Sequence, residues 1–258
     1  MKMTSLSKLW KKATIISGFL IAGIAPIQQQ IFAQSTGINQ IDPKQKLTPA
    51  GTSKNWGNVD GVSMIGLVQG PSATVTDLQV VCAFEYTEGD IFNAPPALPA
   101  EFNGLVHLDK AMNGKFTELR KSGRFVGRRY ETILIDAPKG SSLKAKKYLI
   151  IGLGDRNQFN AGIMTDIGEV AAREAVKLGV TNFAFGSDLK DAGIDSPTAE
   201  VAGNIVKGIV KGYRTEEYLK DNNLAKLKPL KTVYLLAGPA FFTVAGNGIQ
   251  SAIASINN

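Results

Sequence analysis

The sequence predicts an α/β fold: a mixed, mostly parallel sheet of about six strands with helices on both faces. Short apolar runs rich in β-branched residues alternate along the chain with longer stretches whose apolar residues recur at helical spacing. The clearest run, residues 147–154, ends in Gly152-Leu153-Gly154, and a helical pattern follows it directly. An apolar run closed by glycines is typical of a strand buried on both faces. We therefore expect this strand at the centre of the sheet.

The first 33 residues have the layout of a secretory signal peptide. Four lysines precede an uncharged, mostly apolar segment, residues 13–27, and a more polar tail ends at Ala33. The apolar segment has about fifteen residues, fewer than the roughly 20 that span a bilayer. We expect cleavage after Ala33, membrane contact only during export, and a secreted or periplasmic mature protein.

Residues 34–58 are rich in Gln, Ser, Thr, Pro, Gly and Asn, which predicts a flexible, exposed leader before a domain at 59–258. Within the domain, the expected strands are 62–68, 78–84, 130–135, 148–153, 182–185 and 232–236. A turn with Pro138 and Gly140 separates the third and fourth of these runs. It is too short for a crossover helix, so we expect the two strands to pair as an antiparallel hairpin.

Helical spacing predicts helices at 102–121, 160–178, 197 to about 219, and 246–256. Asn113-Gly114 is a potential interruption of the first helix. The third helix carries Gly208 and Gly212 on one face, which favours close packing against another element. Residues 85–101 contain an acidic start and three prolines, and we expect a loop there.

Composition excludes several classes of function. The net charge of +7 includes the four lysines of the leader, so the mature chain carries +3 and gives no support for a nucleic-acid partner. Cys82 and His107 are the only cysteine and histidine, so a Cys/His zinc site is ruled out and a Ser-His-Asp triad could use only His107. No dense carboxylate cluster is visible. We expect no catalytic residue, no metal site and no cofactor.

The glycine turn is the one candidate ligand-binding site. Ligands of open α/β sheets bind at the carboxyl ends of strands, which points to Gly152, Gly154, Asp155 and Arg156. Asn157 stands where the third glycine of a dinucleotide fingerprint is expected, so the match is incomplete. A tight turn that needs glycine for its backbone angles explains the pattern equally, and both interpretations stay open.

Three stretches resemble the N-terminal domain of the leucyl aminopeptidase (cytosol aminopeptidase) family. They are residues 98–104, residues 144–156, and residues 203–213 with the following 217–220. The resemblance extends from about Val62 to Ile256. It implies a macro-like α/β domain without catalytic residues. In the family, a second domain holds two metal ions, and its motifs, such as Asn-Thr-Asp-Ala-Glu-Gly-Arg, do not occur in this sequence.

Together with the predicted signal peptide, which departs from the mostly intracellular enzymes of the family, the resemblance leads us to expect an exported, non-catalytic domain that acts in protein or ligand binding. Family domains of this kind contribute to oligomer contacts, so a homo-oligomer or a separate catalytic-domain partner is expected. Two alternatives remain open. In the first alternative, the chain is the non-catalytic half of a split metallo-aminopeptidase. In the second, it is a macro-like module that binds ADP-ribose or a nucleotide.

Overall fold

The computed structural model describes residues 47–93, 103–189, 194 and 196–258. The chain divides into two compact units, Met1–Gly37 and Ile38–Asn258, and the fold below is that of the second. The predicted signal peptide, its cleavage site and most of the predicted leader lie outside the described residues. Among the helices that the structure describes, none has the length and apolar character to cross a membrane.

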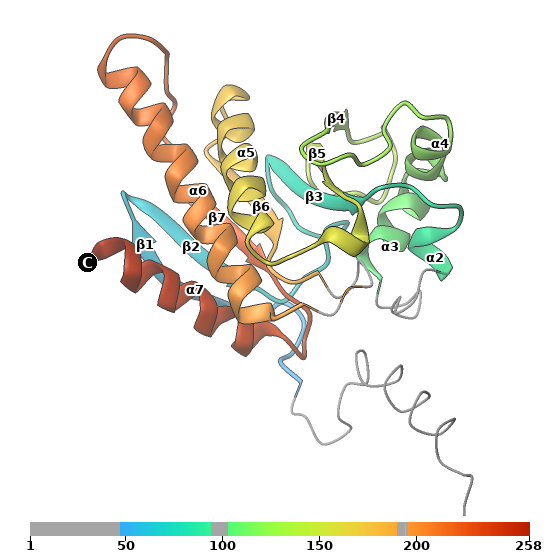
Figure 1. Cartoon of the computed structure of the whole chain (residues 1–258), viewed down its shortest axis with the longest axis horizontal. Helices are drawn as coiled ribbons and strands as arrows, with labels where there is room; N and C mark the ends of the chain where they lie inside the picture. Colours follow the sequence, from blue (N-terminus) through green and yellow to red (C-terminus); the bar gives the residue numbers. More distant parts are fainter. Residues whose placement is uncertain (1–46, 94–102, 190–193, 195) are drawn as a thin grey trace, which may run out of the picture. The chain divides into compact units, whose positions relative to one another are not determined.

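The sheet has seven strands in the order β1-β2-β7-β6-β3-β5-β4 (Figure 1). Their bounds are β1 Ser53–Val59, β2 Val62–Leu67, β3 Leu78–Phe84, β4 Thr132–Asp136, β5 Lys147–Gly154, β6 Asn182–Gly186 and β7 Thr232–Leu236. The inner pairs β2–β7, β7–β6, β6–β3 and β3–β5 are parallel. The outer pairs β1–β2 and β4–β5 are antiparallel. The predicted mixed, mostly parallel sheet and its antiparallel hairpin are confirmed.

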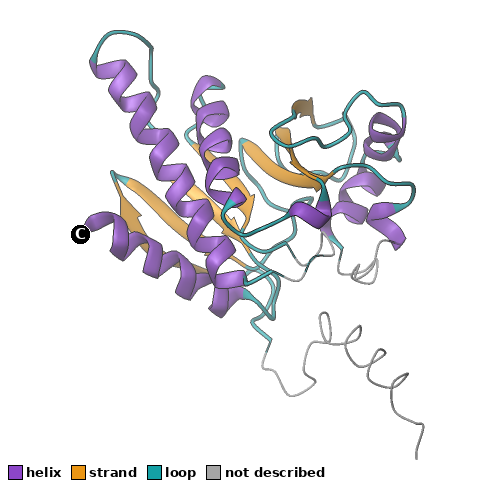
Figure 2. Cartoon of the chain, in the orientation of Figure 1, coloured by secondary structure: helices purple, strands orange, loops and turns teal. Residues whose placement is uncertain are grey.

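Helices cover the two faces of the sheet unequally. The helices are α2 Asp90–Asn93, α3 Gly104–Ala111, α4 Lys115–Lys121, α5 Ile163–Lys177, α6 Thr198–Asp221 and α7 Phe242–Asn257, with a 3-10 turn η1 at Arg156–Gln158. Helices α5, α6 and α7 share one apolar cluster with the sheet (Figure 2). Helices α3 and α4 share a second, smaller cluster with β3 and β5. The helices on both faces are therefore as the sequence predicted.

Strand β5 lies next to the edge strand β4, so the prediction that it is central was wrong. The strand is buried on both sides, as its apolar run indicates: Leu149 and Ile151 face the larger cluster, and Tyr148 and Ile150 face the smaller one. Burial of both faces shows only that a strand has helices above and below it. It does not reveal how many strands lie beyond it.

Strand β1 is the seventh strand, and it forms where the sequence predicted the end of the leader. Trp56 is the reason, because its side chain is only 8% exposed and packs against Phe242 of α7 with ring centres 5.4 Å apart. Gly66 and Gly246 make room for the indole. A Cβ at either glycine would lie 2.1–2.2 Å from a Trp56 ring atom. Trp56 thus anchors β1 to α7, and Val59 is the other residue of this strand in the apolar cluster.

Backbone-to-backbone packing of α5 on α6 depends on the glycines that the sequence singled out. A Cβ at Gly208 would lie 1.9 Å from the carbonyl oxygen of Thr165, and one at Gly212 would lie 2.8 Å from that of Glu169. The prediction of close packing is confirmed. The predicted break at Asn113-Gly114 is confirmed too, since both residues have positive φ and separate α3 from α4.

Candidate functional site

The structure places the four predicted ligand-binding residues in one turn at the carboxyl end of β5. There β5 runs parallel to β3, and Gly154 is the register partner of Phe84. The residues that follow β3 and β5 therefore meet at the same edge of the sheet. This is the edge at which α/β sheets bind ligands.

The two glycines of this turn let another segment cross the strand ends. The N–H of Gly152 donates to the carbonyl of Glu131 at 2.8 Å, and the N–H of Gly154 donates to that of Gly127 at 3.0 Å. A Cβ at Gly152 would lie 2.0 Å from the carbonyl oxygen of Arg128, and Gly154 has a φ of +80°. The glycines are needed for this crossing, and neither N–H is left to bind a phosphate.

Asp155 caps the short 3-10 turn that follows β5. Its carboxylate accepts hydrogen bonds from the backbone N–H of Asn157 at 2.9 Å and from the side-chain amides of Asn157 and Gln158 at 3.1 and 3.3 Å. This cap fixes the direction in which the chain leaves the strand. It also occupies much of the hydrogen-bonding capacity of the carboxylate.

Arg156 is the predicted residue whose side chain faces the strand ends. Its guanidinium lies 5.0 Å from the ring centre of Phe84, the last residue of β3. Burial lowers the pKa of Arg156 from its ordinary value, the nearby Asp90 raises it, and Arg120 lowers it further. The group is therefore a half-buried cation beside a second, fully buried arginine.

That second arginine forms a buried ion pair which sequence reasoning missed. Arg120 donates to both carboxylate oxygens of Asp90, at 2.8 and 2.6 Å, and to the carbonyl of Phe84 at 2.7 Å. The two side chains are only 1% and 5% exposed. The guanidinium also lies 5.3 Å from the ring centres of Tyr86 and Phe116. The pair therefore ties α2 and α4 to the end of β3.

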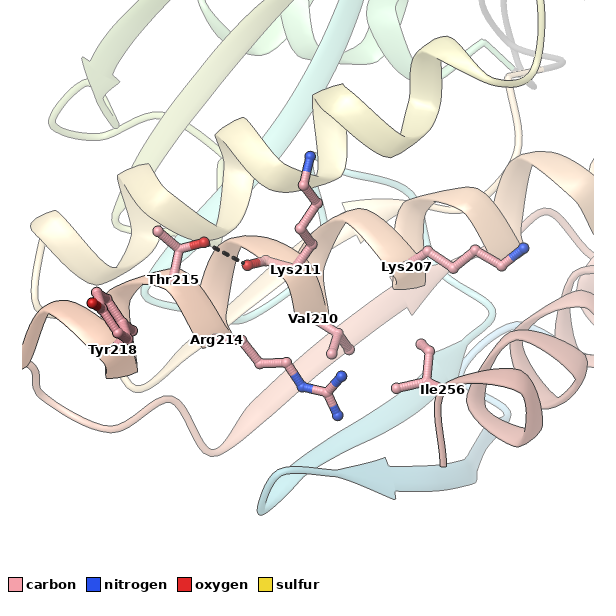
Figure 3. Close-up of a pocket in the computed structure, with 7 residues that line it drawn as sticks. All are labelled: Lys207, Val210, Lys211, Arg214, Thr215, Tyr218 and Ile256. Carbon is pink, nitrogen blue, oxygen red and sulfur yellow. Dashed lines mark hydrogen bonds between the residues drawn. The ribbon is translucent and has the colours of Figure 1, made fainter. Parts of the chain in front are cut away.

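A hollow of about 450 Å³ lies along α6, away from these strand ends (Figure 3). Its walls combine three cations with apolar and aromatic side chains: Lys207, Val210, Lys211, Arg214, Thr215, Tyr218 and Ile256. All but Ile256, which belongs to α7, come from one face of α6. We call this hollow the α6 groove. The sequence feature that indicates this groove is the helical spacing of its cations. The same spacing is typical of a helix face that is exposed to solvent.

Two of the three cations of the α6 groove are held by ion pairs from neighbouring elements. Lys211 pairs with Glu169 of α5 at 2.7 Å, and this hydrogen bond raises the pKa of Lys211. Arg214 donates to Asp60, in the turn between β1 and β2, at 2.7 and 3.2 Å. Lys207 forms no ion pair with any residue that the structure describes. Its ammonium group is the one most available to a bound anion.

The described residues contain no group of three or more His, Cys, Asp or Glu side chains arranged to hold a metal ion. His107 lies exposed on α3, and Cys82 is buried in β3.

Comparison with known proteins identifies relatives of the chain. The family model described as "Cytosol aminopeptidase family, N-terminal domain" matches residues 92–222. A probable cytosol aminopeptidase of Burkholderia orbicola (strain MC0-3) is 26% identical over 154 residues. The match covers 58% of this chain but only 29% of that protein. The chain thus spans less than a third of the length of this curated relative.

Solved structures share the fold at low sequence identity. A mutant of the Oceanobacillus iheyensis macrodomain superposes with a TM-score of 0.54 at 14% identity, over 81% of this chain and 98% of that one. A mutant of tomato leucine aminopeptidase superposes with a TM-score of 0.51 at 19% identity, over 81% of this chain and 37% of that one. The mixed sheet with its helices is therefore a macrodomain-like fold.

The buried pair gives a stability prediction. Asp90→Leu or Arg120→Met leaves one buried charge without its partner, so each should lower the free energy of unfolding by about 3–5 kcal/mol. The double variant should recover much of this loss, because neither charge is then buried alone. Urea denaturation measures the three values.

A matched control is Lys115→Met, which breaks the exposed ion pair with Glu118 at the start of α4. Its denaturation midpoint should stay at that of the parent protein. Equal midpoints for Arg120→Met and Lys115→Met would contradict the structural role of the buried pair.

Proposed function

Since this chain belongs to the cytosol aminopeptidase family, through that family's N-terminal domain, we propose that it is a non-catalytic domain that works by binding a partner. The observation that carries the proposal is the α6 groove, a hollow that joins cations to an exposed aromatic ring and an apolar wall. These are features of sites that anchor a side chain and orient a charge beside it.

The chemistry of the α6 groove favours an acidic protein segment. Lys207 offers an ammonium group without an ion-pair partner among the described residues. Tyr218, about three turns further along the same helix, is 64% exposed at the other end of the groove. Val210 and Ile256 supply the apolar wall (Figure 3). A carboxylate of the segment pairs with the lysine while an adjacent apolar side chain packs on the wall, and a residue further along the segment packs on the ring. Glu169 and Asp60 restrain the other two cations, which reduces the entropy lost on binding.

A fluorescein-labelled, glutamate-rich peptide containing leucine is a suitable probe. Binding should be detectable by fluorescence anisotropy and should weaken as salt screens the charges. Lys207→Glu replaces attraction by repulsion, so it should raise the Kd by about tenfold or more.

Lys139→Glu is the matched control, because it makes the same charge change at an exposed lysine in the turn after β4. It should leave the Kd nearly unchanged. An equal loss in both variants would mean that only net charge matters, and the α6 groove would then not be the binding site.

A role in a split metallo-aminopeptidase is the second candidate. It is supported by the match of residues 92–222 to the N-terminal domain of the aminopeptidase family. On this proposal a separate catalytic-domain polypeptide supplies the metal ions, and this chain holds it in place. Co-purification of such a polypeptide with this chain distinguishes the split enzyme from a stand-alone binding domain.

Both candidates predict that the pure chain does not hydrolyse leucine p-nitroanilide, with or without added manganese or zinc. Release of p-nitroaniline is followed by its absorbance, with a complete aminopeptidase as the positive control. Robust metal-dependent turnover by the pure chain, abolished by chelation, would refute the non-catalytic proposal.

Binding of ADP-ribose or a nucleotide receives less support. The likeness to macrodomains is at 14% identity and concerns the fold, and function does not follow from fold alone. The glycine turn, whose match to a dinucleotide fingerprint is incomplete, has both of its glycine N–H groups bonded to carbonyls. We therefore do not include this activity in the proposal.

We also propose that the chain is exported. This part of the proposal rests on the lysines and the apolar segment of residues 1–33. Expression of the full chain in a secreting bacterial host should yield a mature protein that begins at Gln34. N-terminal sequencing of the periplasmic and extracellular fractions measures this. A cytoplasmic protein with an intact leader would contradict export.

A further inference from the structure

The two edges of the sheet differ in how open they are to another strand. The β1 edge is irregular, because its register shifts between Asn55 and Gly57, and it carries Lys54. Bulges and lysines are common devices that keep an edge from pairing. The β4 edge has neither, since its five residues Thr132–Asp136 pair with β5 in unbroken register (Figure 1).

Hydrogen bonds at the two ends of β4 show which backbone groups face outwards. Gly152 donates to the carbonyl of Glu131, and Ala137 donates to the carbonyl of Lys146, so the groups of residues 131 and 137 face β5. Backbone direction alternates along an antiparallel strand. The N–H and C=O groups of Thr132, Leu134 and Asp136 therefore face away from the sheet. None of the bonds found among the described residues uses these outward groups.

The side chains at this edge are also suited to a contact. Leu134 and Tyr130 are each 42% exposed, and the Tyr130 hydroxyl donates to Asp166 of α5. Ile133 and Ile135, on the other face of the strand, are only partly covered by the smaller apolar cluster. Thr132 and Asp136 are exposed at the two ends. An unpaired edge and apolar surface thus coincide on one short strand.

We propose that β4 pairs antiparallel with β4 of a second copy of this chain, about a two-fold axis at Leu134. In this register the backbone N–H groups of Thr132, Leu134 and Asp136 each donate one hydrogen bond to the partner strand, and their C=O groups each accept one. Leu134 then lies opposite the partner's Leu134, and Thr132 lies opposite the partner's Asp136. One oxygen of the Asp136 carboxylate pairs with Lys147 of its own chain, and the other is left to accept from the Thr132 hydroxyl. The strand is self-complementary in this arrangement, which is what an isologous two-fold contact requires. The two sheets become one continuous sheet.

The first test is the oligomeric state of the purified chain by sedimentation equilibrium. The parent protein should dimerise reversibly as its concentration rises. Leu134→Lys places a charge on the axis and should shift the protein to monomer. Val244→Lys is the matched control, because Val244 on α7 is 44% exposed, and this variant should dimerise like the parent. Circular dichroism checks that both variants are folded.

The second test locates the contact. A hydrogen-bonded antiparallel pair has Cα atoms about 5.5 Å apart, within the range that a disulfide bridges. Leu134→Cys should therefore form a covalent dimer on mild oxidation, whereas Val244→Cys should not, and the native Cys82 is buried. A parent protein that stays monomeric at every concentration overturns the proposal. So does a dimer that persists in Leu134→Lys and gives no cross-link through Leu134→Cys.

Discussion

The parallel pair β3–β5 needs helices on both of its faces, and most of the structure follows from that need. Every residue of β3 is buried, and β5 is buried from Tyr148 to Gly154. Each face of such a pair must be covered by a separate apolar layer. Helices α5, α6 and α7 supply one layer, and α3 and α4 supply the other. Because β3 and β5 are parallel, the segments that follow them begin at the same edge of the sheet.

Because several segments meet at this edge of the sheet, the strand ends have few backbone N–H groups left to bind a phosphate. Gly152 and Gly154 use their N–H groups to hold the segment that crosses them, and Asp155 caps the next turn. Arg120 and Asp90 form a buried ion pair. Burial of the two charges costs desolvation free energy, and the close, bidentate geometry of the pair offsets that cost. Gly152, Gly154 and Asp155 best fit a ligand site by their position in the sequence, but their hydrogen bonds hold this part of the fold together. The binding surfaces that we propose lie instead on the outside of the domain, at α6 and at the β4 edge.

Sequence patterns predicted what is local and missed what depends on distant partners. Apolar periodicity located every strand except β1, which contains a single core aromatic, Trp56, among polar residues. Its burial depends on Gly66 in the neighbouring strand β2 and on Gly246, which is far away in the chain. Likewise, Arg120 and Asp90 each look like surface charges, and only the packing of α4 against the end of β3 brings them together. The cations of the α6 groove were visible as a helical stripe, but the hollow beside them needs Ile256 of α7.

The two outward surfaces are compatible with each other. Strands β1 and β4 form opposite edges of the sheet. The α6 groove is flanked on the β1 side, where Arg214 reaches Asp60 in the β1–β2 turn. Pairing through β4 therefore leaves the groove of each copy open. A dimer would present two grooves to a partner with repeated acidic segments, and the second contact would form at a high effective concentration. On these two proposals, individually weak, salt-sensitive contacts sum to stable binding of the partner.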